Sequence, residues 1–460
     1  MSIAETVSPP PEPSSTRERR PVRSLHRVIW RWHFFAGLCV GPILLIVAVT
    51  GAIYLFGAEI QDLLRADMYY VTPSETSLSW QQQTDLAAAD HPGWTPIRIA
   101  VPAEPGRSTG VSLQAPDDES KLNVYLDPGN GQILGEVDPD ADPLVNFFAV
   151  VLKIHRQLFV GTTGRVIVEL ATGWGLILLL TGMYLWWPRK SGKAHGVWWP
   201  RLKARRYTLL RDLHAIPAAF FVPILFLMTG TGLFYTLCWG TGAVFVSQTV
   251  SEFGTEVAVK DGPARDKDEQ ASDEPEGDAE AVEYIPVDQV IRLAQERFPG
   301  RQITVDYPNG KKAEYGILAI NDYARGTYGP MRSDQLSLDA VTGDVTGHRS
   351  LADNAQYWWH GWVYPLHVGT IGGVATKVFW LLACGVLVAL PVTGTWMWWH
   401  RRPSGGSGIP RRQEGMLPTW LTVLLTVLCF VLPVAGVSVL LILAGEWTFG
   451  RLSRVRWLQT

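Results

Sequence analysis

The sequence has little cysteine, and its few cysteines are placed where they build neither a disulfide framework nor a zinc cluster. All four lie in or beside apolar runs, and no two have CxxC spacing: Cys39, Cys238, Cys384 and Cys429. Structural zinc sites almost always take four ligands at characteristic spacings. The thiols therefore predict no zinc site and no disulfide scaffold.

Other chemical signatures are absent too. The chain has no Rossmann glycine motif, and its long polar segments hold no nucleophile elbow, phosphate loop or metal-ligand cluster. The formal net charge is only −3, and the polar segments 57–143 and 239–354 are acidic rather than basic. A nucleic-acid partner is therefore disfavoured.

What the sequence does have is long apolar runs. A helix needs roughly 20 residues to cross a hydrocarbon core of about 30 Å. Five runs are long enough: 34–56, 166–187, 216–237, 374–399 and 417–444. The arm 1–33 is polar, Pro-rich and basic and leads into the first run without a cleavage site, so we expect that run to stay as an anchor. The fold class predicted is a polytopic α-helical membrane protein with five spans.

The basic residues predict the orientation. Lys and Arg gather in the arm 1–33 and in the loops 188–213 and 400–416, which lie on one side of a five-span topology. Cytoplasmic loops carry the excess of basic residues, so that side is predicted to be the cytoplasm and the polar segments to be exported. The C-terminal arginines would then lie outside, against the rule. Either the fifth span is irregular, as Pro433 and Gly436 allow, or these charges are translocated.

The first four spans repeat in pairs. At one constant offset the first span matches the third: His33 aligns with His214, and Thr50-Gly51 with Thr231-Gly232. At a second constant offset the second span matches the fourth: His155 aligns with His367, and Thr181-Gly182 with Thr393-Gly394. The predicted unit is a helix, an exported domain and a helix, used twice. Such repeats often place a functional site between the halves.

Each exported segment is predicted to be a small α+β module, with a helix at 81–89 or 287–297 followed by short strands. An acidic stretch at 263–278 in the second module is predicted to be a disordered insert. The other predicted boundaries are 144–187 for an interfacial segment and the second span, 214–238 for the third span, 355–399 for an interfacial segment and the fourth span, and 445–460 for the C-terminal tail.

Four of the ten histidines obey the repeat: His33, His155, His214 and His367. A single histidine near a membrane interface is more often a capping or snorkelling residue. Four at matched positions indicate function, because ionisable groups within spans usually face the interior. A helical rise of about 1.5 Å per residue places His33 and His214 at the cytoplasmic end of their spans, and His155 and His367 precede their spans on the outer side. We predict two pairs, one near each face.

A histidine pair on facing helices suits axial ligation of b-type haem through neutral imidazole nitrogens. No CxxCH is present for covalent attachment, and two ligands fall short of the number that zinc takes. We therefore predict two haems b, with iron bound by the four matched histidines. Glu169, the one intramembrane carboxylate near the outer pair, is expected to have an interfacial or packing role.

Several other aromatic residues are weaker candidates. His360 follows Trp358 and Trp359 beside the outer pair and is a candidate for substrate contact or for an alternative ligand. His26 precedes His33 by seven residues and is a candidate replacement for it as a ligand. Most tryptophans fit an interfacial aromatic belt. Trp358, Trp359 and Trp362 are candidates to line a pocket over the outer pair as well.

Together these residues resemble the bacterial PepSY-associated transmembrane proteins, some of which are inner-membrane reductases for ferric siderophores. The matching motifs lie within about 24–402: Trp32-His33-Phe34-Phe35-Ala36-Gly37, His155-Arg156 with Gly161 and Gly164, Arg211-Asp212-Leu213-His214, the Thr-Gly-x-x-x-Trp-Trp exits and two Leu-Asp-x-x-x-Gly hairpins. The resemblance implies two exported PepSY-like modules, an inner haem on His33 and His214, an outer haem on His155 and His367, and a periplasmic site of iron reduction. The acidic insert, the fifth span and the N-terminal arm depart from the family pattern.

The function that we expect is electron delivery across the bacterial inner membrane, with the N-terminus in the cytoplasm. A quinol or another protein would donate electrons at the cytoplasmic face, and a ferric siderophore or other ferric chelate would accept them beneath the exported modules. Two rival hypotheses remain open. One is a PepSY-type regulatory or peptidase-restraining protein with structural histidines, and the other is a siderophore or metal transporter.

Overall fold

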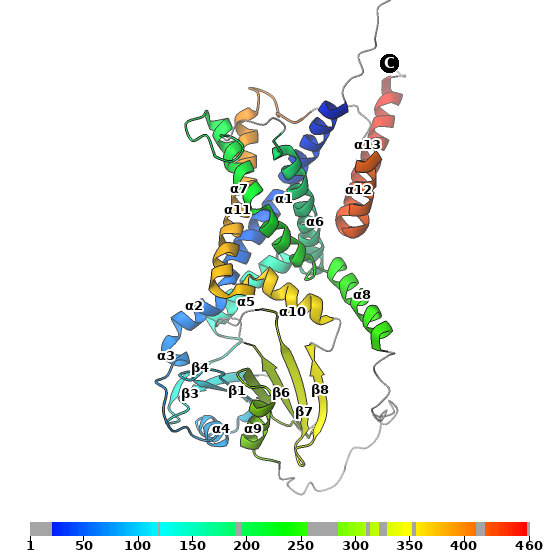
Figure 1. Ribbon diagram of the computed structural model, residues 1–460. Coiled ribbons are helices and arrows are strands. Elements are labelled where there is room, and N and C mark those ends of the chain that lie inside the picture. The colour runs from blue at the N-terminus through cyan, green and yellow to red at the C-terminus, as the bar shows by residue number, and fades with distance from the viewer. Residues whose placement is uncertain are drawn as a thin grey trace, which may run out of the picture.

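The structure, a computed structural model, describes residues 21–117, 120–188, 195–255, 284–309, 313–321, 329–351, 356–410 and 419–457. Figure 1 shows a bundle of long helices at one end and a strand-containing module at the other. The predicted insert at 263–278 and positions 1–20 of the arm lie outside the described residues.

Four helices in the described part are long and apolar enough to cross a membrane, and the chain is a membrane protein. They are α1 (Pro21–Leu55), α6 (Gly161–Trp186), α7 (Arg206–Leu233) and α11 (Gly373–Arg401). They correspond to the first four predicted spans. α1 begins well before the predicted start at residue 34, so His33 lies inside the helix rather than before it.

Small side chains allow the long helices of the bundle to approach one another closely. A Cβ atom on Gly41 of α1 would lie only 3.1 Å from the Cβ of Pro391 on α11. Leu225 of α7 and Ala383 of α11 are fully buried in one apolar cluster of the bundle. Helix association in membranes relies on such close packing, because lipid tails are as apolar as the side chains they replace.

One antiparallel sheet contains the strands of both polar segments, in the order β4-β3-β2-β1-β5-β6-β7-β8. The strands are β1 (Thr95–Val101), β2 (Thr109–Gln114), β3 (Lys121–Leu126), β4 (Ile133–Val137), β5 (Gln302–Asp306), β6 (Glu314–Ile320), β7 (Ser333–Asp339) and β8 (Val345–Ser350). β1 pairs with β5 in the middle, with Arg98 opposite Asp306 and Val101 opposite Ile303. From the centre of the sheet outward, the strands of each segment therefore follow in chain order, β1 to β4 on one side and β5 to β8 on the other.

The two predicted modules thus share one sheet and one core. α4 (Trp80–Ala89) and α9 (Val287–Arg297) pack against that sheet, and α9 has the predicted bounds. Ile99 of β1, Ile291 of α9 and Ile303 of β5 are at most 1% exposed in the same cluster. Pairing β1 with β5 removes the open sheet edge that each module would otherwise present to water.

Shorter helices connect the bundle and the sheet. α2 (Gly57–Leu64) and α3 (Ala66–Tyr69) follow α1, and α8 (Cys238–Thr255) follows α7. α5 (Pro143–Gln157) and α10 (Gln356–His367) lie between the bundle and the sheet, as Figure 1 shows. α5 ends where Leu158 and Phe159 adopt positive φ angles of 50° and 60°, so the chain turns sharply before α6 begins.

The predicted fifth span, 417–444, is not a single helix. α12 (Thr419–Val431) ends before Leu432, and α13 (Pro433–Trp457) begins directly after it, because proline has no N–H to continue the hydrogen-bond ladder. The 13 residues of α12 span about 20 Å, which is short of a core of about 30 Å. In Figure 1 the C-terminus lies at the end of the bundle where α1 begins. The structure therefore does not confirm a fifth span, and the break at Leu432 fits the irregular alternative.

Asp142 ties the start of α5 to the short helices after α1. Its carboxylate accepts hydrogen bonds from the backbone N–H groups of Leu144 and Val145 at 2.9 Å and from the Arg65 guanidinium at 2.5 Å. The hydrogen bond from Arg65 is the main cause that lowers the pKa of Asp142. A carboxyl group with a lowered pKa stabilises the folded state above its unfolded pKa. That contribution is lost as the pH falls through the folded pKa.

We expect Asp142→Asn to destabilise the protein at pH 7 by about 1.5–3 kcal/mol, the value of a hydrogen bond to a charged group. Asparagine still caps a helix but carries no charge for Arg65. The difference from the unsubstituted protein should shrink as the pH is lowered from 7 to 3, as measured by thermal unfolding in detergent. The exposed Asp140→Asn is the matched control. A loss of stability that is the same at both pH values contradicts this role.

Candidate functional site

The structure brings the four matched histidines together as two pairs. In the inner pair, His33 of α1 and His214 of α7 have ring centres 6.3 Å apart and ring planes at 87°. In the outer pair, His155 near the end of α5 and His367 at the end of α10 have ring centres 6.3 Å apart and ring planes at 56°. Each pair joins one residue from the first predicted repeat unit to one from the second.

The two pairs lie at opposite ends of the bundle. His33 and Thr50 are both on α1, and Thr50 contacts His155 of the outer pair. The stretch of α1 between His33 and Thr50 corresponds to about 25 Å along the helix axis. The outer pair lies at the end that faces the sheet, where α5 and α10 are placed (Figure 1). The arrangement therefore offers two sites across most of the bundle's length.

Each histidine is held through its Nδ1 atom by a threonine on a neighbouring long helix. The Nδ1–Oγ1 distances are 2.9 Å for His33–Thr181, 3.2 Å for His155–Thr50, 3.0 Å for His214–Thr393 and 3.4 Å for His367–Thr231. Three of the rings also contact a backbone carbonyl oxygen through Nδ1: His155 with Val47 at 2.9 Å, His214 with Leu390 at 3.1 Å and His367 with Met228 at 3.0 Å.

These contacts determine the tautomer of each neutral ring. Every one of the four threonine hydroxyls donates to the carbonyl oxygen four residues earlier in its own helix, at 2.6–2.8 Å. The hydroxyl oxygen is then an acceptor for the imidazole, so Nδ1 carries the proton and donates it. The lone pair is on Nε2, the nitrogen available to a metal. Such outer hydrogen bonds orient metal-binding histidines and raise their basicity.

A glycine follows each of these threonines, and it gives the imidazole room. A Cβ atom on the glycine would lie close to the histidine Cε1: 3.1 Å for Gly51 and His155, 3.2 Å for Gly182 and His33, 3.0 Å for Gly232 and His367, and 3.5 Å for Gly394 and His214. The Thr-Gly pairs are thus cradles for the rings. In the sequence analysis the Thr-Gly pairs were used only to identify the repeat. Their constant spacing from the histidines was the signal that could have pointed to this role.

The residues present fit a haem at each site, because each pair sets two imidazoles with their ring centres 6.3 Å apart and their Nδ1 atoms engaged by threonines. The Nε2 atoms of each pair would hold the haem iron. Neither pair has a described cysteine or carboxylate among the contacts of its rings, so the donor set is two imidazoles. That set suits haem iron better than zinc.

Other predicted residues take different positions. His360 of α10 lies beside Tyr235, with ring centres 6.5 Å apart, and Trp362 is half-buried on the same helix. The side chains of Trp358 and Trp359 lie outside the described part of the chain. His26 does not belong to either histidine pair; its ring lies 6.3 Å from that of Tyr184 on α6.

Glu169 has a structural role in this arrangement. It is buried in α6, and its two carboxylate oxygens accept the backbone N–H groups of Cys238 and Trp239 at 2.7 and 3.0 Å. These N–H groups belong to the first turn of α8, whose dipole favours a negative charge there. The expected packing role therefore has a specific form, which is to cap the start of α8.

The structure also assembles residues that sequence reasoning missed. Tyr235, beside His367 with ring centres 5.6 Å apart, has a buried hydroxyl without a hydrogen-bond partner in the described structure. In the sheet module, Asp90, His91 and Glu136 bring three metal-ligand atoms within 4.8 Å of one another. The sequence analysis found no such cluster, because Glu136 is 45 residues from His91 and only the sheet brings them together.

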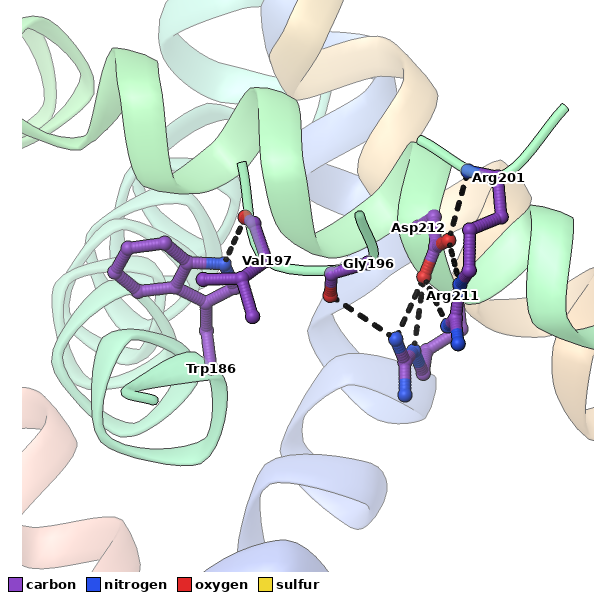
Figure 2. Close-up of polar contacts among 6 residues, drawn as sticks. All are labelled: Trp186, Gly196, Val197, Arg201, Arg211 and Asp212. Atoms are coloured by element: carbon purple, nitrogen blue, oxygen red, sulfur yellow. Dashed lines mark hydrogen bonds and ion pairs between the residues drawn. The ribbon is translucent and has the colours of Figure 1, made fainter. Parts of the chain in front are cut away.

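A buried aspartate fixes the loop that precedes the inner pair. Figure 2 shows Arg201 and Arg211 converging on Asp212, which is fully buried. Arg201 Nε donates to Asp212 at 2.8 Å, and Arg211 Nη2 donates to it at 2.7 Å. Arg211 also donates to the carbonyl of Gly196 at 3.2 Å. This clamp holds the loop against the first turns of α7, two residues before His214.

Comparison with known proteins places these features in one region. The family model described as "PepSY-associated TM region" matches residues 30–401. That range contains both histidine pairs and all four Thr-Gly cradles. No curated protein matches the chain.

Proposed function

The chain belongs to the family with a PepSY-associated TM region, and on that basis we propose that it is a di-haem membrane protein that delivers electrons to ferric iron. The proposed substrate is a ferric siderophore or another ferric chelate. The protein would then be an oxidoreductase. The inner pair, His33 and His214, and the outer pair, His155 and His367, are the proposed ligands of two haems b.

One observation carries the proposal: four imidazoles stand as two pairs with ring centres 6.3 Å apart, and the threonines engage Nδ1, which leaves each Nε2 lone pair for a haem iron. Bound haem would supply one-electron transfer between the two ends of the bundle. The chain's own residues hold the rings in position and keep each Nδ1 protonated. The Thr-Gly cradles therefore support the ligands from outside the site.

The substrate class follows from coordination chemistry. Siderophores bind Fe(III) through hard oxygen donors, and these hold Fe(II) far less tightly, so one added electron releases the metal. Half-buried His360 and the tryptophans Trp358, Trp359 and Trp362 of α10 are the proposed contacts to the chelate. They belong to the helix that ends in His367 of the outer pair. The chelate would therefore be reduced at the end of the bundle that faces the sheet.

We also propose that the two halves arose by duplication and that the protein lies in a bacterial inner membrane. The mirrored strand order and the matched His–Thr contacts support a duplicated unit. In this orientation the N-terminus of α1 is cytoplasmic and the sheet is periplasmic, as the basic loops predict. The C-terminus lies at the same end as the start of α1 (Figure 1). The C-terminal arginines would then be on the cytoplasmic side, in agreement with the rule that basic residues gather there.

The test is an absorption spectrum of the purified full-length protein expressed with ample haem. We expect a Soret band, sharp bands on reduction, and two haems per chain by pyridine haemochromogen assay. Adding ferrioxamine to the reduced protein should return the oxidised spectrum and release Fe(II) to a ferrous-specific dye. A colourless protein would refute the proposal and favour a regulatory role. A haem protein that ferric chelates do not reoxidise would refute the substrate class.

A further inference from the structure

A shallow groove on the surface of α6 lies beside the inner pair. It has a volume of about 360 Å³ and is lined by Leu180, Met183, Tyr184 and Trp187. Leu180 on this membrane-spanning helix is 44% exposed, and Trp187, directly after the helix ends, is 63% exposed, so the groove opens toward lipid. Among the residues that the structure describes, no charged side chain lines it. A ligand in this groove would therefore come from the bilayer and be largely apolar.

The groove is separated from the inner pair by the width of one helix. Thr181 and Gly182 lie between Leu180 and Met183 in the sequence, and both contact the ring of His33. The residues that line the groove and the residues that hold the ligand thus belong to the same turn of α6. A redox-active molecule in the groove would be close to the inner pair.

A protonatable residue lies beside one of the residues that line the groove. The ring of His26 on α1 is 6.3 Å from the ring of Tyr184, which lines the groove. His26 precedes His33 by seven residues, which is two turns and about 10 Å toward the start of α1. Imidazole is the side chain that most often acts as a general base at neutral pH. The groove therefore combines lipid access, a proton acceptor and a redox site.

We infer that this groove binds a membrane quinol, which is the electron donor of the protein; the inference rests on the proposed function. A quinol has an apolar tail that suits the lipid-facing side and two hydroxyl groups that suit His26 and Tyr184. A nicotinamide or flavin nucleotide carries phosphates, for which the described lining of the groove offers no basic residue.

The chemistry balances with two electrons and two protons. One quinol loses two hydroxyl protons and two electrons and becomes a quinone. The quinol would give up its electrons one at a time to a haem held by the inner pair, and two ferric chelates would each accept one electron and become ferrous, so electrons and charge balance. His26 accepts a proton from the quinol hydroxyl as general base, and both protons are released to water at this end of the bundle.

The test uses full-length protein loaded with haem in detergent and follows its reduction by decylubiquinol and by menadiol in a stopped-flow spectrometer. Leu180→Trp fills the groove, and His26→Gln removes the base but keeps an amide of similar length. We expect both variants to be reduced at least about tenfold more slowly than the unsubstituted protein, since general base catalysis contributes about 10²–10⁴-fold. Dithionite, which needs no groove, should reduce all of them alike.

The controls are Leu381→Trp, a 41% exposed leucine on membrane-spanning α11, and the exposed His195→Gln. Both should keep the rate of the unsubstituted protein. Groove variants that react as fast as the controls would overturn the quinol site. Failure of both quinols to reduce a protein that dithionite reduces would also overturn it, while the proposed function would stand. A purified protein that contains no haem would contradict both the quinol site and the proposed function.

Discussion

Replacing His155 or His367 with alanine is expected to leave a protein that binds one haem instead of two. The two rings of the outer pair are 6.3 Å apart, and among the described histidines they contact each other. Removing one of the two proposed haem ligands would leave the other imidazole without its partner. The inner pair contacts a different set of helices and should keep its haem. Pyridine haemochromogen assays should give about one haem per chain, and reduction of ferric chelates should be lost.

The matching result is expected at the inner pair. His33→Ala or His214→Ala should also give about one haem per chain. In these variants the step that fails first should be reduction of the protein by quinol. His360→Ala and His26→Ala are the matched controls, since each removes a histidine near one of the pairs, and both should keep two haems. Retention of two haems in the His155 and His367 variants, or loss of haem in the His360 variant, would contradict the pairing.

The second large effect is expected from a glycine that contacts no haem-binding atom directly. A Cβ atom on Gly232 would lie 3.0 Å from Cε1 of His367, which is tighter than nine in ten real Cβ contacts. The ring must therefore shift from the position in which it contacts Thr231 and faces His155. We therefore expect Gly232→Val to lose the outer haem and the reduction of ferric chelates.

Gly230→Val is the matched control for this experiment. Gly230 is on the same helix, two residues earlier, and a Cβ atom there meets nothing within 4 Å. Both substitutions place a β-branched residue in α7, so they share any cost to the helix itself. The haem-to-protein ratio should be about one in the Gly232 variant and two in the Gly230 variant. Equal haem content in the two proteins would show that the Thr-Gly cradle has no role in holding the ring.

The contacts between the histidines and the Thr-Gly pairs could not be predicted from the sequence. The histidines were predicted from their own spacing, and the structure brings the predicted partners together as two pairs. The contact of His367 with Gly232 joins residues from different helices, and so does that of His33 with Thr181, 148 residues away. No local pattern states which Thr-Gly pair faces which histidine. The packing of four helices decides it.

The sheet is a second example. The periodicity and the turn residues of each polar segment predicted a helix and short strands, and the helix at 287–297 has those bounds. Whether two such modules stay apart or pair depends on the edges of β1 and β5, which are distant in the sequence although Val101 lies opposite Ile303 in the sheet. The cluster of Asp90, His91 and Glu136 depends on the same sheet.

The sequence by itself determined what is local: four apolar runs long enough to span a membrane, the basic loops beside them, the repeated histidines and the family to which the chain belongs. These depend on helix length, on side-chain polarity and on spacing along one chain. Only the tertiary structure decided that two modules form one sheet and that each histidine has its Nδ1 turned to a threonine. Those features depend on contacts between distant residues, because burial and hydrogen bonding are satisfied across the whole fold rather than within one segment.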